Sequence, residues 1–352
     1  MSLEKLALCA GSIGIFLGVG CGQLPKKGNI LSANLSNFEE LPPCVDDDCN
    51  CNDFNSQASA QVVLNAFPTD PFVLDKDQNG YACETLPLEA TAESTEGLQE
   101  TDSRPTESIH LSLGNPSNAA TGTRNNHLLV RGQYALSYHA DRGTANWVAW
   151  QLTADWLGNT ERQNNFRQDG VLPSGSYQVT PSDYVNTGFD RGHIVPSADR
   201  TRSIQDNSAT FLMTNVWPQA PENNRGVWRE LEEYSRDWVE RFDYTLFILA
   251  GGYGKQTQIA EGQVTVPSRL WKIIVFLEPE QTIDEIDSRT MVVAVDMPNR
   301  DGLGDDWRDY QTTVDRIEVA TGYDFLSVLS SDVQAVVEAR VSSDCSTPNE
   351  CP

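Results

Sequence analysis

The sequence predicts an α+β fold in which a central antiparallel sheet is flanked by helices. Between residues 128 and 295, short apolar runs typical of strands follow one another in groups, with few helical segments between them. A doubly wound sheet needs strands and helices in regular alternation, so this grouping favours α+β. The length of 352 residues allows one sizeable domain and a smaller module.

Seven apolar runs are expected to form strands. The first three are separated by turns rich in glycine, asparagine and aspartate, which is typical of antiparallel neighbours. The last three are interpreted as central strands. The expected strands are 128–130, 134–138, 147–152, 210–215, 246–250, 271–277 and 291–295.

Two helices are expected to flank the sheet. Apolar positions recur at helical spacing in 227–242, and 323–338 is expected to form a closing helix. If the first helix begins near Asn223, its free N–H groups and dipole favour an anion there. Four side chains spaced four residues apart would then share one face: Asn224, Trp228, Glu232 and Arg236.

The charge balance argues against a protein that coats nucleic acid. The formal charge is −25, with 5 Lys/Arg against 17 Asp/Glu in residues 1–108 and 20 against 33 in residues 109–352. Such a chain would have to engage a phosphate backbone locally, through placed arginines and a metal ion. That suits an enzyme that releases its substrate better than a sequence-specific regulator.

Residues 1–21 are expected to be a targeting leader. Residues 6–19 form an apolar run of about 14 residues, shorter than the roughly 20 that span a bilayer and typical of a signal peptide. The small residues before Cys21 resemble a bacterial lipoprotein processing site, which would make Cys21 a lipidated membrane anchor. Cleavage and secretion, with Cys21 incidental, is the alternative. Either route implies export to an oxidising compartment, periplasmic, cell-surface or extracellular.

Cysteines after the leader cluster near the two ends of the chain. They are Cys44, Cys49, Cys51, Cys83, Cys345 and Cys351. The spacings in the first cluster fit zinc ligation poorly, so disulfides are expected. The best pairs are Cys51–Cys83 and, in a Cys-containing tail of residues 343–352, Cys345–Cys351, although sequence alone does not fix the connectivity.

Residues 44–86 are expected to form a small separate module. A segment with helical spacing, 58–67, is followed by a loop with oxygen-bearing side chains at positions 1, 3 and 5 and glycine at 6, which suits a hard cation. The loop resembles the excalibur family of extracellular calcium-binding modules, with Asn79 in place of the third aspartate. The resemblance implies calcium ligands at Asp75, Asp77, Asn79, Tyr81 and Glu84. An ordinary Asp/Asn/Gly turn is the alternative.

Residues 87–108 are expected to be an acidic linker, because glutamate, aspartate, serine and threonine leave nothing there to bury. The globular pattern begins at residue 109, and residues 109–342 are expected to form one domain.

The stretch 184–202 carries residue types suited to phosphodiester chemistry. His193 can take a proton near neutral pH, and Arg191 can grip a phosphate, with Arg200 and Arg202 close behind. For peptide or glycoside cleavage, a Ser or Cys nucleophile or paired carboxylates would be expected instead.

Each candidate also has a structural interpretation. An isolated histidine is commonly just a hydrogen-bonded side chain, Asn224 is a natural helix cap, and Glu232 with Arg236 would make a surface ion pair. Three further histidines are expected to be structural: His110, His127 and His139. Four tryptophans in apolar runs are expected in the core: Trp147, Trp150, Trp156 and Trp271.

Several motifs occur together between residues 109 and 340. They are the Asp-Arg-Gly-His run 190–193, residues 213–219, the spacing Asn224…Trp228…Glu232, and the stretches 113–117, 143–150 and 161–166. On these motifs the chain resembles the DNA/RNA non-specific endonuclease family.

The resemblance implies a ββα-metal (His-Me finger) fold and a role for each site residue. His193 would be the general base that activates water. Asn224 would be the sole protein ligand of Mg²⁺ (or Mn²⁺), and Glu232 would hold metal-bound water. The remaining roles would be transition-state stabilisation by Arg162 and Arg236 and shaping of the site by Asp190 and Arg191.

These roles are physically consistent. Magnesium dehydrates reluctantly and prefers oxygen ligands, and an uncharged amide leaves its full charge available to the leaving oxygen. An imidazole with its ordinary pKa of about 6.5 is unprotonated at the working pH. Together with the expected leader, the resemblance implies an exported Mg²⁺-dependent endonuclease that cleaves DNA and RNA with little sequence preference and leaves 5′-phosphates.

Two other functions are compatible with the sequence. One is a catalytically inactive, envelope-anchored calcium-binding or adhesion protein, and the other is a specialised phosphodiesterase with poor activity on long polymers. The preference for DNA or RNA, and the existence of an inhibitor protein in the producing cell, are left open.

Overall fold

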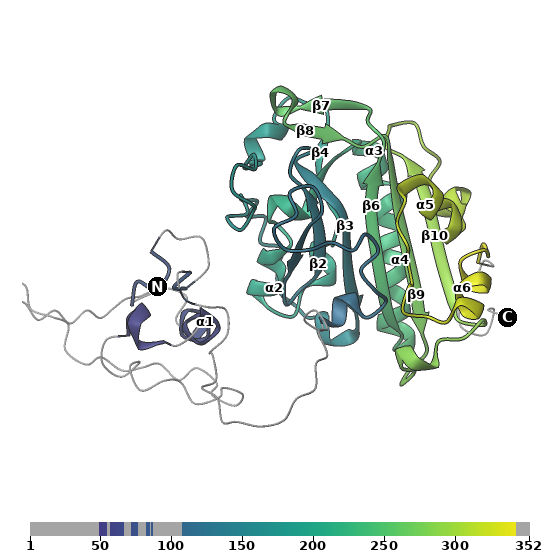
Figure 1. Cartoon of the computed structure of the whole chain (residues 1–352), viewed down its shortest axis with the longest axis horizontal. Helices are drawn as coiled ribbons and strands as arrows, with labels where there is room; N and C mark the ends of the chain where they lie inside the picture. Colours follow the sequence, from purple (N-terminus) through teal and green to yellow (C-terminus); the bar gives the residue numbers. More distant parts are fainter. Residues whose placement is uncertain are drawn as a thin grey trace, which may run out of the picture. The chain divides into compact units, whose positions relative to one another are not determined.

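The computed structural model describes residues 49–54, 57–66, 72–76, 82–84, 86 and 108–342. The chain divides into two compact units, residues 1–101 and 102–352 (Figure 1). The expected leader, nearly all of the linker, the C-terminal tail and the Cys345–Cys351 pair lie outside the described residues. Within the described ranges, no helix is long and apolar enough to cross a membrane.

The N-terminal unit contains helix α1 (Gln57–Ala66) and a disulfide. The helix agrees with the expected segment to within one residue at each end. Cys51 is bonded to Cys83, which confirms the first expected pair. Phe54 and Val63 are buried in the small core beside it. Of the expected calcium ligands, Asp75 and Glu84 are described, whereas Asp77, Asn79 and Tyr81 lie outside the described residues.

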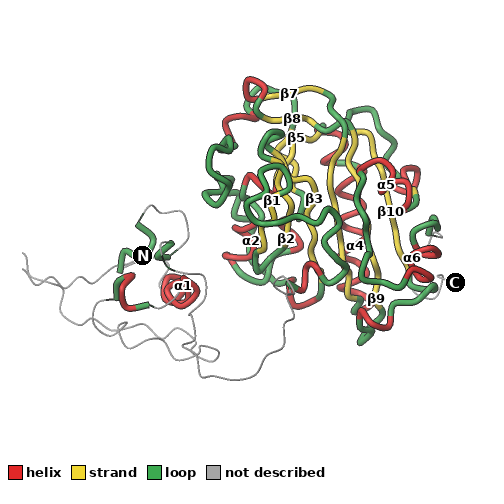
Figure 2. Tube along the Cα trace, viewed as in Figure 1, coloured by secondary structure: helices red, strands yellow, loops and turns green. Residues whose placement is uncertain are grey.

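The C-terminal unit is built on one seven-stranded antiparallel sheet (Figures 1 and 2). Its strand order is β1-β2-β3-β6-β9-β10-β11, and every pairing is antiparallel. The strands are β1 (His127–Val130), β2 (Ala135–His139), β3 (Thr144–Leu152), β6 (Thr245–Tyr253), β9 (Arg269–Leu277), β10 (Met291–Pro298) and β11 (Gln311–Thr312). Every expected strand except 210–215 is therefore confirmed as a member of this sheet.

Alternating side chains of the central strands form two apolar layers, one on each face of the sheet. On one face, Ile248 and Ile274 belong to the same buried cluster as Leu231 of α4 (Val227–Phe242), the helix expected at these residues. On the other face, Ile273 clusters with Ile317 of α5 (Val314–Thr321) and with Val337 of α6 (Ser331–Val337). Burial of each such side chain contributes roughly 1.5–3 kcal/mol, so both layers hold the sheet in place.

The expectation of a strand at 210–215 is wrong. Met213–Asn215 is a 3₁₀ turn, and the strand begins only at Val216. The run is buried because its polar groups are satisfied internally: Asn215 donates its amide to the carbonyls of Val195 and Thr210. Burial without sheet pairing therefore mimics the apolar pattern of a strand.

The expectation of one helix at 323–338 is also wrong. The chain instead forms α5 before Gly322 and the short α6 after residue 330. Thr313 accepts a hydrogen bond from the N–H of Arg316 at the start of α5, and Gly322 ends the helix with a positive φ of 74°. Both signals are visible in the sequence on either side of α5.

A second sheet, of two strands, carries the histidine stretch. β4 (Asp190–His193) pairs antiparallel with β5 (Val216–Gln219), and α3 (Pro221–Arg225) follows β5 almost directly. His193 therefore lies at the end of a strand, and Asn224 lies in the helix that follows the partner strand. The described α-helices and strands also include α2 (Ile204–Ala209) and the antiparallel pair β7 (Thr257–Ile259) and β8 (Val264–Val266).

Candidate active site

One cleft of about 570 Å³ gathers the predicted site residues. Six of the predicted residues line it: Arg162, Arg191, His193, Asn224, Glu232 and Arg236. Asp190 lines an adjoining hollow that shares Arg162, Arg191 and Asn224 with the cleft. The β4–β5–α3 unit thus places the imidazole and the carboxamide in the same depression of the surface.

The imidazole of His193 is held by aromatic rings. It meets Phe211 edge-on, with 4.7 Å between ring centroids, and Phe166 at 5.0 Å. Its Nε2 is buried and has no hydrogen-bond partner in the described part of the chain. Burial, together with Arg162 and Arg191, lowers the pKa of His193 to about 3. The expectation of an ordinary pKa for His193 is wrong. The ring is nevertheless unprotonated at neutral pH, as a general base must be.

Two arginines flank the histidine on the same rings. The guanidinium of Arg191 lies over Phe166, 4.3 Å from the ring centroid, and that of Arg162 lies over Phe211 at 4.9 Å. Arg162 also donates to Ser197 Oγ at 2.6 Å. Stacking holds a guanidinium by its face and leaves N–H groups at its edge for a phosphate.

The carboxamide of Asn224 is oriented by Asp190. Asn224 Nδ2 donates to Asp190 Oδ2 at 2.9 Å. An ionised carboxylate can only accept, so the amide nitrogen must face Asp190 and the amide oxygen is left for another partner. Arg225 donates two bonds to the same carboxylate, at 2.7 and 2.5 Å, and so fixes its position.

The expected cap and the expected continuous helix face are both wrong. Asn224 lies inside α3, and the chain breaks at Gly226 before α4 begins, so Asn224 caps neither helix. A Cβ at Gly226 would lie 2.7 Å from the carbonyl oxygen of Glu222, which leaves no room for a side chain at the junction. The neighbouring Asn223 is fully buried and anchors α3 by donating to the carbonyl of Pro298.

Glu232 and Arg236 contact a buried polar network, and the surface-pair interpretation is wrong for them. Arg236 donates to Asp199 Oδ1 at 2.8 Å, and Asp199 Oδ2 accepts from the indole of Trp150 at 3.0 Å. Glu232 Oε1 lies 3.8 Å from Lys272 Nζ. The two residues therefore project from α4 toward the sheet at the floor of the cleft.

Burial sets the ionisation of this network. It raises the pKa of Glu232 to about 7, against the opposing influence of Lys272 and Arg236. Burial also lowers the pKa of Lys272. Burial also acts to lower the pKa of Arg236, but the nearby carboxylates of Asp199 and Glu232 outweigh it, so the pKa of Arg236 is raised. Glu232 is thus poised to change its charge near neutral pH.

Three residues that support the site are not predicted from the sequence: Phe211, Asp199 and Lys272. Lys272 is only 1% exposed, and its Nζ lies 4.4 Å from the centroid of Trp228. Its sequence signal is a lysine in the middle of an apolar strand, because a charge buried there must have a partner. Phe211 and Asp199 carry no comparable signal.

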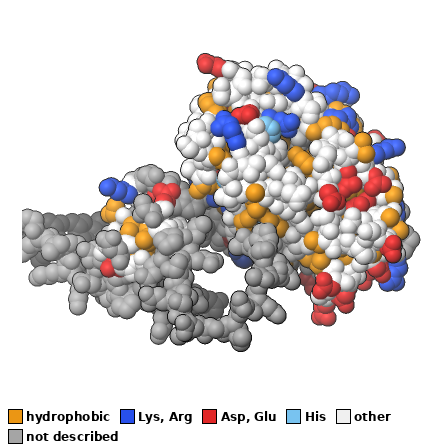
Figure 3. All heavy atoms as spheres, viewed as in Figure 1, with side chains coloured by type: hydrophobic (Ala, Val, Ile, Leu, Met, Phe, Trp, Pro, Cys, Tyr) orange, Lys and Arg blue, Asp and Glu red, His pale blue; other side chains and the backbone are white. Residues whose placement is uncertain are grey.

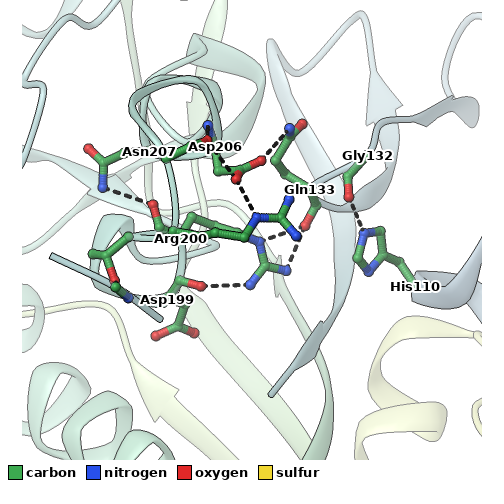
Figure 4. Close-up of polar contacts among 11 residues, drawn as sticks. His110, Gly132, Gln133, Asp199, Arg200, Asp206 and Asn207 are labelled. Atoms are coloured by element: carbon green, nitrogen blue, oxygen red, sulfur yellow. Dashed lines mark hydrogen bonds and ion pairs between the residues drawn. The ribbon is translucent and has the colours of Figure 1, made fainter. Parts of the chain in front are cut away.

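Arg200 and Arg202 do not line the cleft, and the phosphate role is wrong for Arg200. Arg200 is fully buried and donates to backbone carbonyls, including two bonds to Gln133 at 2.9 and 2.6 Å (Figure 4). Arg202 pairs with Asp206 at 2.9 Å, and both guanidinium groups lie over Trp156. They brace the turn that follows His193.

The other histidines lie away from the cleft. His110 donates Nε2–H to the carbonyl of Gly132 at 2.9 Å (Figure 4), and His127 Nδ1 accepts from Gly122 at 2.9 Å. His139 lines a separate hollow. The four tryptophans expected in the core are at most 8% exposed, which confirms them: Trp147, Trp150, Trp156 and Trp271.

The donor set of the cleft fits a divalent cation that keeps most of its water. It offers the oriented amide oxygen of Asn224 and, further in, the carboxylate of Glu232. Among the described residues, the one group of three or more Asp, Glu, Cys or His side chains close enough to bind a metal directly lies outside the cleft, at Asp315, Glu318 and Glu338. Magnesium, which is bound through few protein oxygens, suits the cleft better than zinc or calcium.

A neutral proton acceptor, an oriented amide oxygen and fixed guanidinium groups together suit an enzyme that cleaves phosphodiester bonds. The family model of DNA/RNA non-specific endonucleases matches residues 113–332. The chain belongs to that family, and it is therefore a nucleic-acid-cleaving enzyme.

Relatives extend the comparison. A nuclease of Nostoc sp. (strain PCC 7120 / SAG 25.82 / UTEX 2576) is 51% identical over 246 residues, covering 69% of this chain and 89% of that protein. The Serratia marcescens nuclease is 27% identical, covering 62% and 82%. Human mitochondrial endonuclease G is 31% identical, and the match covers 49% of this chain and 60% of the human protein.

The fold has a counterpart among solved structures. The crystal structure of the EndoG/EndoGI complex aligns with a TM-score of 0.54 at 22% identity, covering 64% of this chain and 95% of that one. The similarity shows an endonuclease G-like fold, with a central antiparallel sheet and helices.

Proposed function

We propose that this chain is a Mg²⁺-dependent endonuclease that hydrolyses DNA and RNA with little sequence preference and leaves 5′-phosphate ends. The observation that carries the proposal is a neutral, buried imidazole and an oriented amide oxygen in one arginine-lined cleft. Relatives named as nucleases and as endonuclease G support it. Mn²⁺ would replace Mg²⁺, because the two ions accept the same oxygen ligands.

In the proposed mechanism, water attacks the phosphorus and the bond to the 3′ oxygen breaks. His193 takes a proton from that water, because its neutral ring carries a free lone pair. A bound phosphate offsets the positive charges of Arg162 and Arg191, which raises the pKa of His193 so that the ring can hold the proton. Arg162 and Arg236 stabilise the charge that develops on the phosphate oxygens.

The supporting groups have distinct tasks. Asn224 would hold Mg²⁺ through its amide oxygen, with Glu232 holding one of the metal-bound waters. When bound, the cation supplies positive charge to the departing 3′ oxygen. Asp190 keeps the amide oxygen turned away from itself, and Lys272 favours the ionised form of Glu232.

A metal-dependence assay on both nucleic acids tests the proposed function. With magnesium, supercoiled plasmid is nicked and then linearised, and a long RNA is degraded; with excess EDTA, both stay intact. The new 5′ ends accept label from a polynucleotide kinase only after phosphatase treatment. Intact polymers in both conditions would support the adhesion-protein alternative, and cleavage of short diesters alone would support the specialised phosphodiesterase.

The acidic limb of the pH–rate profile is expected to report Glu232. A carboxyl with a pKa of about 7 loses its charge as the pH falls through 7, whereas His193, at about 3, adds no step between pH 5 and 8. At subsaturating magnesium, kcat/KM therefore falls below about pH 7, and added magnesium moves the limb to lower pH because a cation favours the carboxylate. Initial rates across pH at two magnesium concentrations measure this.

Lysine substitutions supply the control for this profile. Lys272→Met removes the cation beside Glu232 and moves the limb to higher pH, whereas Lys255→Met, at an exposed loop position, leaves the profile unchanged. Glu232→Gln removes the limb altogether and decides the case if Lys272→Met does not fold. A limb that stays in place in Glu232→Gln would assign it to another group.

We further propose that the N-terminal unit is an excalibur-like calcium module, tethered by the acidic linker to an exported nuclease. The Cys51–Cys83 disulfide supports export, because such bonds persist in oxidising compartments. Lipidation at Cys21 would attach the enzyme to a membrane. Fractionation of cells that express the wild-type or Cys21→Ser chain tests this, since retention of Cys21→Ser in the membrane fraction would exclude the anchor.

A further inference from the structure

We propose that Asp315, Glu318 and Glu338 form a second cation site, suited to calcium, on the opposite face of the main sheet from the catalytic cleft. Asp315 and Glu318 come from α5, and Glu338 directly follows α6. Apolar residues of α5 and α6 cluster with one face of the sheet, whereas those of α4, whose Glu232 and Arg236 line the cleft, cluster with the other. This site is independent of the proposed nuclease mechanism.

The spacing of the three carboxylates fits one ion. Each offers one oxygen, and these oxygens all lie within 4.8 Å of one another. Oxygens this close together can all contact one ion. Three carboxylates from two helices suit Ca²⁺, which takes about six to eight oxygen ligands in a flexible geometry, better than Mg²⁺, which is usually bound through about one or two carboxylates and several waters.

Glu338 supplies an independent observation that points to a ligand. The residue is only 6% exposed, and its Oε1 is buried with no hydrogen-bond partner in the described part of the chain. A buried carboxylate oxygen without a donor is costly, so it requires either a proton or a cation. The two carboxylates beside it offer no donor when ionised.

The charges around Glu338 favour a cation. Burial raises the pKa of Glu338 to about 8, and Glu318, Asp315 and Asp324 raise it further in the same direction. Figure 3 shows acidic side chains gathered on the surface over the region of α5. A divalent cation would neutralise this repulsion between the carboxylates.

The backbone already brings the two helices together at this point. The N–H of Asp315 donates to the carbonyl of Glu338 at 3.2 Å, and the N–H of Phe325 donates to Glu318 Oε1 at 2.8 Å. An ion bound here would fasten the end of α6 to the start of α5. We therefore expect calcium to stabilise the C-terminal part of the enzyme rather than to take part in cleavage.

Thermal unfolding of the full-length chain in EDTA and in calcium chloride tests this site. All chains carry Asp75→Asn and Asn224→Ala, so that neither the N-terminal loop nor the cleft contributes, and no nucleic acid is present. At a calcium concentration about a hundredfold above the dissociation constant, the melting temperature is expected to rise by roughly 5–10 °C. Restoring Asp75 in a parallel chain tests the N-terminal calcium site, whose own contribution would appear as an additional shift.

Two site variants and one control decide the outcome. Glu338→Gln and Asp315→Asn each remove one charged ligand and are expected to abolish most of the calcium shift. Glu240→Gln removes an exposed acid from α4 and keeps the full shift. Because Asp315 is exposed, its variant decides the case if Glu338→Gln does not fold. A calcium shift in Asp315→Asn equal to that of the parent chain, or no shift in the parent, would overturn the proposal.

Discussion

Replacing His193 with alanine is expected to lower kcat on plasmid DNA and on RNA by about 10²–10⁴-fold, the usual contribution of a positioned general base. The substitution removes the proton acceptor but leaves Arg162, Arg191 and Asn224, which would contact the phosphate and the metal ion. Binding of uncleaved DNA, measured in EDTA by fluorescence anisotropy, is therefore retained. Rates at saturating magnesium, compared with wild type, give the effect.

The matched control is His139→Ala, which removes a half-buried imidazole from a hollow separate from the cleft. It is expected to cleave at the wild-type rate. Since His193 fills a space between Phe166 and Phe211, a second variant, His193→Gln, limits the loss of packing. Wild-type turnover in either His193 variant would remove the histidine from the mechanism.

Replacing Asn224 with alanine is expected to reduce cleavage by at least about a thousandfold, because charge stabilisation by a bound metal ion is worth several kcal/mol and each 1.36 kcal/mol is tenfold in rate. The deficit is expected to shrink as magnesium is raised, since the lost amide oxygen weakens metal binding. Cleavage rates over a magnesium titration separate this effect from a simple loss of turnover.

Asp190→Asn tests the orientation of that amide. In this variant, residue 190 can donate as well as accept a hydrogen bond, so the amide of Asn224 can turn its oxygen toward residue 190. We therefore expect the half-saturating magnesium concentration to rise, while kcat at saturating magnesium changes less. For the Asn224→Ala prediction, Asn159→Ala, at an exposed position outside both hollows, serves as the asparagine control.

Equal magnesium dependence in wild type and Asn224→Ala would show that the amide of Asn224 does not hold the ion.

The sheet could be predicted because its signal is local. Antiparallel strands such as β6 and β9 bury both faces and read as long apolar runs, and α4 shows its full apolar periodicity between Val227 and Phe242. The run at 210–215 also contains three consecutive apolar residues, yet in the described part of the chain its backbone pairs only in an isolated bridge with Arg167. Asn215 donates to the carbonyls of Val195 and Thr210. That choice depends on contacts distant in sequence, and no local pattern reveals it.

The site could be predicted in its contacting residues but not in its supports. His193, Asp190 and Asn224 belong to recognisable motifs, but the hydrogen bond by which Asp190 orients the amide of Asn224 joins residues 34 positions apart and is visible only in the folded chain. The pKa of His193 departs from 6.5 because burial and two stacked arginines act together, and burial is a property of the folded chain. The pKa shifts of Glu232 and Lys272 likewise arise from burial in the folded chain.

The break at Gly226 separates the part of the site that carries the amide of Asn224, the proposed metal ligand, from the part that carries the carboxylate of Glu232. Asn224 lies on a helix of five residues and Glu232 on one of sixteen, and the joint between them has no room for a Cβ. Engineers who wish to change ion preference can therefore redesign the short segment while leaving the long one untouched. The same joint restricts which substitutions the protein can accept during evolution. Any other residue at position 226 would shift α3 relative to α4, so that Asn224 and Glu232 would both have to be repositioned.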